Sequence, residues 1–349
     1  MRCLAILTVR NEGAFLLEWL AHHMGVGFTD FLVFSNDCQD GTDVMLDRLA
    51  QLGHLTHVRN SIAVGRSAQW SALKQADRHP LKATADWVLF LDVDEFVNIH
   101  HGAHTLPDLL AALPEATAIA LTWRVFGNCG VTAFRDAPIT RQFTRAAQNP
   151  PLWPWRLGMF KTLFRNDGSY TKLGGHRPKS PDHARLDAAR WFDGSGRPLD
   201  ASYRTRRLFS NFWEDNYQLV QLNHYPLGAM ESFILKCDRG RSNRTDTEIG
   251  LGYWCERNLC HDEDTSINAS WPRTAQALKA LKADEQLTRL HTDACVWRKE
   301  RFEALMLDET LRGLYGQLLL TPPTRAISHD EAARLMAWAR LGQAATGAR

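Results

Sequence analysis

Residues 87–94 read Trp87-Val88-Leu89-Phe90-Leu91-Asp92-Val93-Asp94, and this stretch decides the fold. Five apolar residues in a row predict a strand that is buried on both faces, as the central strands of parallel sheets are. Two aspartates follow at positions i and i+2, where the carboxyl end of the strand is expected. Ligands of open α/β sheets bind in the crevice outside such strand ends. The stretch therefore predicts a mostly parallel sheet with an acidic pair at its ligand-binding edge.

The chain before this strand alternates short apolar runs with helical patterns. Strands are predicted at residues 3–9, 30–34 and 54–58, and helices at residues 12–24, 42 to about 52, and 68–78. Asp40-Gly41-Thr42 is interpreted as a turn and helix cap. Strands that alternate with helices form βαβ units, so this half is expected to be Rossmann-like.

The regularity weakens after the acidic pair. A helix is predicted at residues 105–113 and strands at 117–123 and 159–164, while residues 127–215 are rich in Gly, Pro, Arg and aromatic side chains. From residue 274 onward helices dominate, at 274–282, 284–290 and near 297–320. Ser328 and Glu331 form a capping box for a last helix. The predicted fold class is α/β, a mixed sheet flanked by helices with a helical C-terminal extension.

Composition narrows the class of protein. The 349 residues carry a net charge of +2 without a long Lys/Arg run, so we expect no nucleic-acid partner. No stretch reaches the ~18 apolar residues of a transmembrane helix, and only peripheral membrane contact is left open. Seven scattered cysteines predict a reduced, cytoplasmic protein, with the inner membrane face as a further location. A zinc group of Cys255, Cys260 and His261 is disfavoured by its spacing.

The acidic pair has two interpretations. Close carboxylates are hard oxygen ligands that suit Mg²⁺ or Mn²⁺, and Mg²⁺ is commonly held by one or two carboxylates plus substrate phosphates. Asp92 and Asp94 would then join a metal to a nucleotide diphosphate. Alternatively, Asp92, Asp94 and Glu95 are a polar loop after a strand, because a bare D-x-D is common.

Ordered blocks along the chain extend the motif. They are Val9-Arg10-Asn11-Glu12, Glu18 to His23, Ser35 to Thr42, Asp92 to Phe96, Phe126-Gly127-Asn128, Asn223-His224-Tyr225 and Lys236 to Gly240. Together they resemble glycosyltransferases of the family 2-like and family 92-like type, whose DNxSxDGT, DVDEF and NHY elements they match in order and spacing. Two features depart from the pattern. Arg10 stands where Lys is usual, and the Lys expected before Ser is missing within residues 227–231.

The resemblance implies a GT-A fold. Residues 1–125 would be the nucleotide-sugar-binding half, 126–245 the acceptor-side half of the same domain, and 246–349 a mostly helical region. The residues that it places at the base and ribose are Arg10, Asn11, Glu12, Asp37, Asp40 and Asp92. It makes Asp92 and Asp94 ligands of Mn²⁺ or Mg²⁺, with a third ligand from the far half of the chain. His224 is our candidate, a core histidine bonded to the backbone being the alternative.

Basic residues supply candidates for the diphosphate. Lys236, Arg239 and Arg241 are charge-assisted donors, or else a solvated helical face. Lys74 on the third predicted helix either reaches the nucleotide or is an ordinary exposed lysine. For His22 and His23 we favour packing over function.

An inverting transferase needs a carboxylate that deprotonates the acceptor hydroxyl. Asp215 is the first candidate for this base, followed by Glu214 and Glu95. Asp215 and Glu214 are flanked by aromatic residues that suit a sugar, but an acidic pair at a helix start is the alternative.

The predicted function is metal-dependent transfer of a hexose from a nucleotide-diphosphate donor, UDP-hexose being expected, to a saccharide or lipid-linked acceptor, as in polysaccharide biosynthesis. A nucleotidyltransferase is the first alternative, but residues 10–13 hold one glycine where that class needs a Gly-rich loop. A non-catalytic nucleotide-sugar-binding module is the second, although both aspartates are present.

Overall fold

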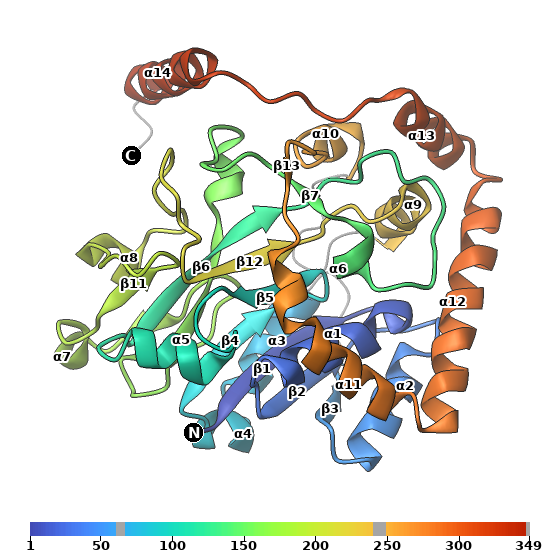
Figure 1. Ribbon diagram of the computed structural model, residues 1–349, viewed down its shortest axis with the longest axis horizontal. Coiled ribbons are helices and arrows are strands. Elements are labelled where there is room, and N and C mark those ends of the chain that lie inside the picture. Colours follow the sequence, from blue (N-terminus) through green and yellow to red (C-terminus); the bar gives the residue numbers. More distant parts are fainter. Residues whose placement is uncertain (61–66, 240–248, 347–349) are drawn as a thin grey trace.

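The computed structural model describes residues 1–60, 67–239 and 249–346. Within them a mixed sheet runs through the middle of the molecule, with helices on both faces (Figure 1). Its strands are β1 (Cys3–Val9), β2 (Asp30–Ser35), β3 (Thr56–Arg59), β4 (Trp87–Leu91), β5 (Glu95–Ile99), β6 (Ala118–Val125), β8 (Phe160–Arg165), β11 (Trp191–Asp193) and β12 (Val220–His224). The strand order is β3-β2-β1-β4-β8-β6-β12-β5, and β11 pairs with β6. The predicted fold class is confirmed.

The four strands β3, β2, β1 and β4 are parallel neighbours. Leu7 of β1 pairs with Val33 on one side and with Leu91 on the other, so the carboxyl ends of three strands meet at one edge. β8 comes from much later in the chain and lies antiparallel between β4 and β6. β12 then joins β6 in parallel and β5 in antiparallel pairing. The acidic turn between β4 and β5 therefore faces residues from the second half of the chain.

Helices and short elements complete the described chain. The helices are α1 (Gly13–Gly25), α2 (Thr42–Gln51), α3 (Ala68–Ala76), α4 (Pro80–Thr84), α5 (Leu106–Ala112), α6 (Ile139–Gln142), α7 (His183–Leu186), α8 (Ala201–Thr205), α9 (Met230–Arg239), α10 (Leu251–Cys255), α11 (Trp271–Leu281), α12 (Glu285–Leu305), α13 (Glu309–Leu320) and α14 (His329–Thr346). The short strands are β7 (Arg145–Ala146), β9 (Tyr170–Lys172), β10 (Lys179–Pro181) and β13 (Asp262–Glu263), and 3₁₀ turns lie at Trp155–Gly158 and Ser266–Ser270.

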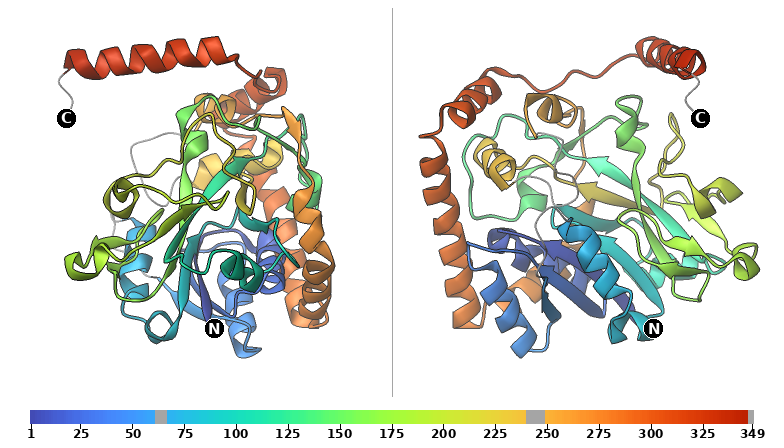
Figure 2. Two further views of the ribbon diagram at one scale, coloured as in Figure 1. Left: turned by 60° about the vertical axis from the view of Figure 1, so that its left-hand side comes forward. Right: turned by 180° about the vertical axis from the view of Figure 1, so that it is seen from behind.

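The C-terminal helices wrap one side of the molecule. α12 runs along the edge of the Rossmann-like half, and α14 stands apart at the end of an extended segment (Figure 2). Ser328 and Glu331 form the predicted capping box: each backbone N–H donates to the other's side chain, at 2.9 and 3.2 Å. Among the described helices, none combines the length and apolarity that crossing a membrane requires.

The apolar run of β4 is explained by burial on both faces. Leu89 and Leu91 belong to the core formed with α1, α2 and α11, while Val88 and Phe90 point to the opposite core under α3. A strand between two apolar layers has no solvent face, so it shows no alternation in sequence.

His22 and His23 on α1 are buried structural residues, which confirms the packing interpretation. The Nε2 atom of His22 lies 2.8 Å from the carbonyl oxygen of Val97, and Nδ1 of His23 lies 2.8 Å from that of Trp19. Burial lowers the pKa of His22 to about 4, so its imidazole is neutral in the folded protein near pH 7.

Two secondary-structure expectations are corrected. The strand β5 directly after the acidic pair was not predicted, because its main partner β12 lies more than a hundred residues away. The break expected after residue 290 is absent: α12 is continuous from Glu285 to Leu305. The chain breaks instead before α13, where the Asp308 side chain accepts a hydrogen bond from the Leu311 N–H at 2.9 Å. Packing against α1, α2 and α9 keeps the polar residues 291–293 helical.

Candidate functional site

Asp92-Val93-Asp94 forms a tight turn between β4 and β5, at the edge where the parallel strands end. The Asp92 N–H donates to Oε2 of Glu95 at 2.8 Å, and the Glu95 N–H donates to the Asp92 carbonyl at 3.1 Å. Glu95 thereby closes the turn that presents the two aspartates.

A buried lysine lies under this turn. The Nζ atom of Lys161, on β8, lies 2.9 Å from Oδ2 of Asp92 and 3.4 Å from Oε2 of Glu95, and its side chain is only 1% exposed. Burial disfavours the ammonium of Lys161, but the two carboxylates outweigh burial and raise its pKa. Burial also raises the pKa of Glu95, whose Oε1 accepts a hydrogen bond from Trp123 Nε1 at 2.7 Å. Lys161 therefore supplies the positive charge that allows this acidic turn to be packed into the protein.

The other aspartate faces the second half of the chain. Lys236 on α9 donates to Oδ2 of Asp94 at 2.9 Å and to the carbonyl of Pro226 at 2.7 Å. His224, at the end of β12, places Nε2 3.8 Å from Oδ1 of Asp94. The structure thus brings together three residues that the sequence singled out separately: Asp94, His224 and Lys236.

His224 has the properties expected of a metal ligand. Its ring packs against Trp123 with the ring centres 4.3 Å apart, and burial lowers its pKa to about 3. Nδ1 of this ring has no hydrogen-bond partner in the described part of the chain, so the backbone-bonded core histidine of the alternative interpretation is not what the structure shows. A neutral imidazole beside an ionised carboxylate fits Mn²⁺ in donor chemistry, whereas Mg²⁺ would rely on the carboxylates.

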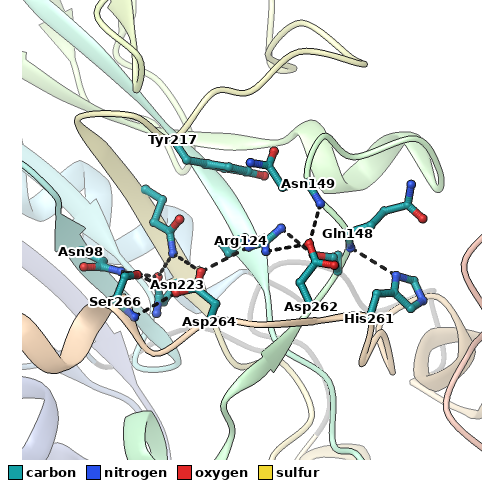
Figure 3. A network of polar contacts seen from close by, with 12 residues as sticks. Asn98, Arg124, Gln148, Asn149, Tyr217, Asn223, His261, Asp262, Asp264 and Ser266 are labelled. Atoms are coloured by element: carbon teal, nitrogen blue, oxygen red, sulfur yellow. Dashed lines mark hydrogen bonds and ion pairs between the residues drawn. The ribbon is translucent and has the colours of Figure 1, made fainter.

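Asn223, which precedes His224 on β12, points to the opposite side of the strand, because successive side chains alternate along a strand. Asn223 accepts hydrogen bonds from Gln221 at 2.7 Å and from Asn98 at 3.3 Å. Figure 3 shows this network continuing through Asp264 to Arg124, which lies between Asp264 and Asp262. The Asn223 position of the NHY element is therefore structural and anchors the strand that carries His224.

A cleft with about 610 Å³ of empty space, open solvent included, lies beside Asp94. Its lining includes residues that follow β1, β4 and β12, and residues of α1, α9 and α12. They are Asn11, Glu12, Phe15, Val93, Asp94, Tyr225, Pro226, Ser232, Lys236, Asp238, Arg239, Trp297 and Arg298. Arg239 pairs with the Glu12 carboxylate and donates to the Arg10 carbonyl at 2.9 Å. Asn11, Glu12, Asp94, Lys236 and Arg239 thus share one cavity, as expected for a single ligand site.

Arg298 is a cleft residue that sequence reasoning missed. Its guanidinium lies 4.5 and 5.2 Å from the ring centres of Phe15 and Phe134, and its Nη1 is 4.0 Å from Oε2 of Glu12. The side chain is 5% exposed, and within the described residues its Nε has no hydrogen-bond partner. Burial lowers its pKa. A buried guanidinium that lines a cleft and, among the described residues, has an unpaired N–H donor is suited to bind an anion. The sequence around residue 298 contains no motif that predicts this role.

The remaining donor-site candidates differ in their surroundings. Asp40 is buried, and its two oxygens accept from the N–H groups of Gly13 and Thr42, each at 2.9 Å, so it fastens the start of α1 to the start of α2. Asp37 is exposed with a φ of 43°, and Lys74 is exposed on α3. Their contact with a nucleotide stays a prediction. Arg241 lies outside the described residues.

The candidate bases lie elsewhere. Glu214 pairs with Nη1 of Arg197 at 2.6 Å, and Asp215 accepts from the Tyr217 N–H at 3.0 Å. Neither lines the cleft at Asp94 or a smaller one of about 230 Å³ beside Trp123 and His224. The structure does not place them with the acidic turn, and their catalytic role stays a prediction.

Two cysteines are paired, against the expectation of unpaired thiols. A disulfide joins Cys129 to Cys260, 131 residues later in the chain. Gly127 makes this close approach possible, since a Cβ there would lie 2.6 Å from the Cys260 sulfur. Because its sulfur is in the disulfide, Cys260 is not available to a zinc group with Cys255 and His261, which the spacing in the sequence also disfavours.

Comparisons with known proteins agree with the blocks found between residues 9 and 128, whereas the blocks at residues 223–225 and 236–240 lie beyond the matched range. The sequence profile of glycosyltransferase family 92 matches residues 2–180, just over half of the chain. A glycosyltransferase family 92 protein of Oryza sativa subsp. japonica is 24% identical over 139 residues, which cover 39% of this chain and 23% of that protein. One of Ricinus communis is 25% identical over 154 residues, 40% of this chain and 25% of that protein. The chain thus spans about a quarter of the length of these relatives.

Solved structures with some likeness are more distant. A mannosyltransferase from Pyrobaculum calidifontis, solved with GDP-Man and Mn²⁺, has 17% identity and a TM-score of 0.32 over 90% of this chain and 83% of its own. S. aureus TarS residues 1–349, solved with UDP, has 16% identity and a TM-score of 0.34 over 67% of this chain and 63% of its own.

Proposed function

This chain belongs to glycosyltransferase family 92, and on that premise we propose that it transfers a hexose from a nucleotide-diphosphate donor, UDP-hexose being expected, to a saccharide or lipid-linked acceptor. One observation carries the proposal: Asp94 and Lys236 line one cleft together with Asn11 and Glu12, and His224, which lines the smaller neighbouring cleft, approaches the same Asp94 carboxylate. Such a cleft offers a metal-binding end and an end for the base and ribose, as a nucleotide diphosphate requires.

Asp92 and Asp94 of the turn, together with His224 from the end of β12, would hold the divalent ion. Mn²⁺ or Mg²⁺ supplies Lewis-acid stabilisation of the charge that grows on the leaving diphosphate. Lys161 on β8 would hold the Asp92 side chain in place, because its Nζ lies 2.9 Å from Oδ2 of Asp92. Glu95 has both oxygens engaged by the turn and by Trp123, which favours a positioning role for it over that of the base.

Three cations would bind the diphosphate oxygens: Lys236, Arg239 and Arg298. All three line the cleft, and Lys236 and Arg239 already bind carboxylates of the same cavity. Charge-assisted hydrogen bonds from buried cations are among the stronger polar contacts, about 1.5–3 kcal/mol each. In this proposal an acceptor hydroxyl attacks the sugar carbon in line, the bond from that carbon to the diphosphate breaks, and the configuration inverts. Asp215 and Glu214 stay the predicted bases, although neither lines the cleft at Asp94.

Nucleotide-sugar binding and donor hydrolysis test the proposal. We expect UDP-hexoses to raise the melting temperature of the protein only with Mn²⁺ or Mg²⁺, and to be hydrolysed slowly in the absence of an acceptor. Asp94→Asn should lose both effects. Asp187→Asn is the matched control, because the Asp187 side chain is fully exposed on the surface. The proposal fails if no nucleotide sugar stabilises the protein with metal, or if Asp94→Asn behaves as the control does.

A further inference from the structure

We propose that Asp136, His291 and Cys295 form a second metal site, separate from the acidic turn, that takes Zn²⁺ or a similar transition metal. These residues offer an oxygen, a nitrogen and a sulfur atom that all lie within 4.8 Å of one another. They come from two distant parts of the chain: Asp136 from the segment between β6 and α6, the other two from α12.

The helix sets the geometry of two of the ligands. His291 and Cys295 are four residues apart on α12, so their side chains lie on the same face, one turn from each other. Nε2 of His291 is 3.8 Å from the sulfur of Cys295 and 2.9 Å from Oδ1 of Asp136. Two ligands on a tetrahedral zinc ion, bonded at roughly 2.0–2.3 Å, are about 3.3–3.7 Å apart. The three donor atoms therefore need to move little to bind one ion.

The set of ligands indicates which metal would bind. Thiolate and imidazole favour Zn²⁺ and other borderline or soft transition metals, whereas Mg²⁺ and Ca²⁺ prefer an all-oxygen shell. Asp136 is 53% exposed, which leaves the site open to solvent on one side and allows water as a fourth ligand. The acidic turn, with carboxylates as its principal donors, suits the harder Mn²⁺ or Mg²⁺, so the two sites differ in the ion that they prefer.

A hydrogen-bonded triad explains this cluster less well. In a Cys-His-Asp relay the acid and the nucleophile bind different nitrogens of the imidazole. Here both approach Nε2, which carries at most one proton for two neighbours. The Nδ1 atom of His291 is buried and without a hydrogen-bond partner in the described part of the chain, so no group orients the ring from behind. A metal ion would give each of the three converging atoms a bond.

The position of the site suggests what it does. Phe134, two residues from Asp136, packs edge-on against Phe15 with the ring centres 6.0 Å apart, and both rings contact the Arg298 guanidinium. Arg298 follows Cys295 by one turn of α12. A metal that ties the segment at Asp136 to α12 would therefore fix the aromatic wall that holds Arg298 at the cleft. We infer that this metal site is structural, joining the segment at Asp136 to α12, and not catalytic.

Metal titration of untagged protein, freed of metal by chelation, tests the site. We expect Zn²⁺ to bind and to raise the melting temperature, with one bound equivalent that depends on Cys295. Co²⁺ should give the near-ultraviolet charge-transfer band of a cobalt–thiolate bond. Cys295→Ala should remove that band and weaken Zn²⁺ binding by at least the roughly 10–100-fold that loss of an outer-sphere partner causes. The Co²⁺–thiolate band should persist in Asp94→Asn, since the acidic turn contains no thiol.

Cys237→Ala is the matched control, because Cys237 is a half-buried free thiol on the neighbouring helix α9. Asp136→Asn, at an exposed position, gives a second variant that tests the site without disturbing the core. The proposal is overturned if wild-type protein binds no Zn²⁺ in excess of Cys295→Ala, or if the Co²⁺ complex lacks the thiolate band. Because these readouts use no nucleotide, they are independent of whether the proposed transferase activity is found.

Discussion

Lys236 Nζ lies 2.9 Å from Oδ2 of Asp94, although 142 residues separate them in the chain. Burial opposes the charge of both groups, but the attraction between them is larger, so the pKa of Asp94 is lowered and that of Lys236 is raised. The pair joins α9 to the turn between β4 and β5 and keeps Asp94 ionised. It also sets a cation beside the proposed metal position, where a diphosphate would lie.

Replacement of Lys236 by Met tests its contact with the diphosphate. With Mn²⁺ present we expect the affinity for UDP to fall about 10–100-fold, the loss of one charged hydrogen bond of about 1.5–3 kcal/mol. The affinity for uridine, which has no phosphate, should stay within a factor of about two. Isothermal titration calorimetry measures both, with Lys299→Met, an exposed position on α12, as the control. Equal losses for UDP and uridine would show that Lys236 acts only by supporting the fold.

Lys161→Met should destabilise the protein by about 1–3 kcal/mol near pH 7, because it removes the buried partner of Asp92 and leaves Glu95, whose pKa burial already raises, to be protonated. Urea unfolding followed by circular dichroism measures this change. Adding Glu95→Gln should recover part of the loss, since the amide is neutral, and a double-mutant cycle gives the coupling between the two. Lys172→Met, on the exposed strand β9, should cost less than about 0.5 kcal/mol. If both lysine variants unfold at the same urea concentration, the buried pair does not stabilise the turn.

His22 makes stability depend on pH. Burial lowers its pKa in the folded state to about 4 from an ordinary value of 6.5. Between these two values only the unfolded chain takes up the proton, so stability is full above about pH 6.5 and is lost as the pH falls towards 4. The loss amounts to about 3 kcal/mol, and His22→Gln should remove this part of the slope.

The free energy of unfolding in urea, measured at several pH values from 7 to about 4.5, checks this expectation. His183→Gln is the control, because His183 is an exposed histidine on the surface helix α7. A slope that is the same in wild type and His22→Gln would mean that His22 is not the group responsible.

The disulfide between Cys129 and Cys260 should leave five titratable thiols in the unfolded, unreduced protein. Reduction should lower the free energy of unfolding by about 2–5 kcal/mol, because the link closes a long loop and restricts the unfolded chain. A double variant, Cys129→Ser with Cys260→Ser, should match the reduced protein and show no response to reductant. Seven thiols in air-oxidised protein would contradict the pairing.

The local elements of the Rossmann-like half follow from the sequence alone. Residues 87–91 form the strand predicted for them, and Asp92 and Asp94 lie at its carboxyl end. Periodicity and strand-end rules suffice here because each depends on neighbours within about ten residues. The blocks around Asp94, His224 and Lys236 also predict these residues as site candidates, and the order of the blocks in the chain suggests the family.

Only the tertiary structure decided which of these residues meet. Lys161 reaches the acidic turn because β8 inserts antiparallel beside β4, and Arg298 reaches the cleft because α12 packs along α1 and α9. The pairing of Cys129 with Cys260 and the cluster at His291 likewise join segments more than a hundred residues apart. No sequence period records such contacts. These contacts are determined by how the whole chain buries its apolar surface. Buried charged groups then pair with those groups of opposite charge that packing places near them.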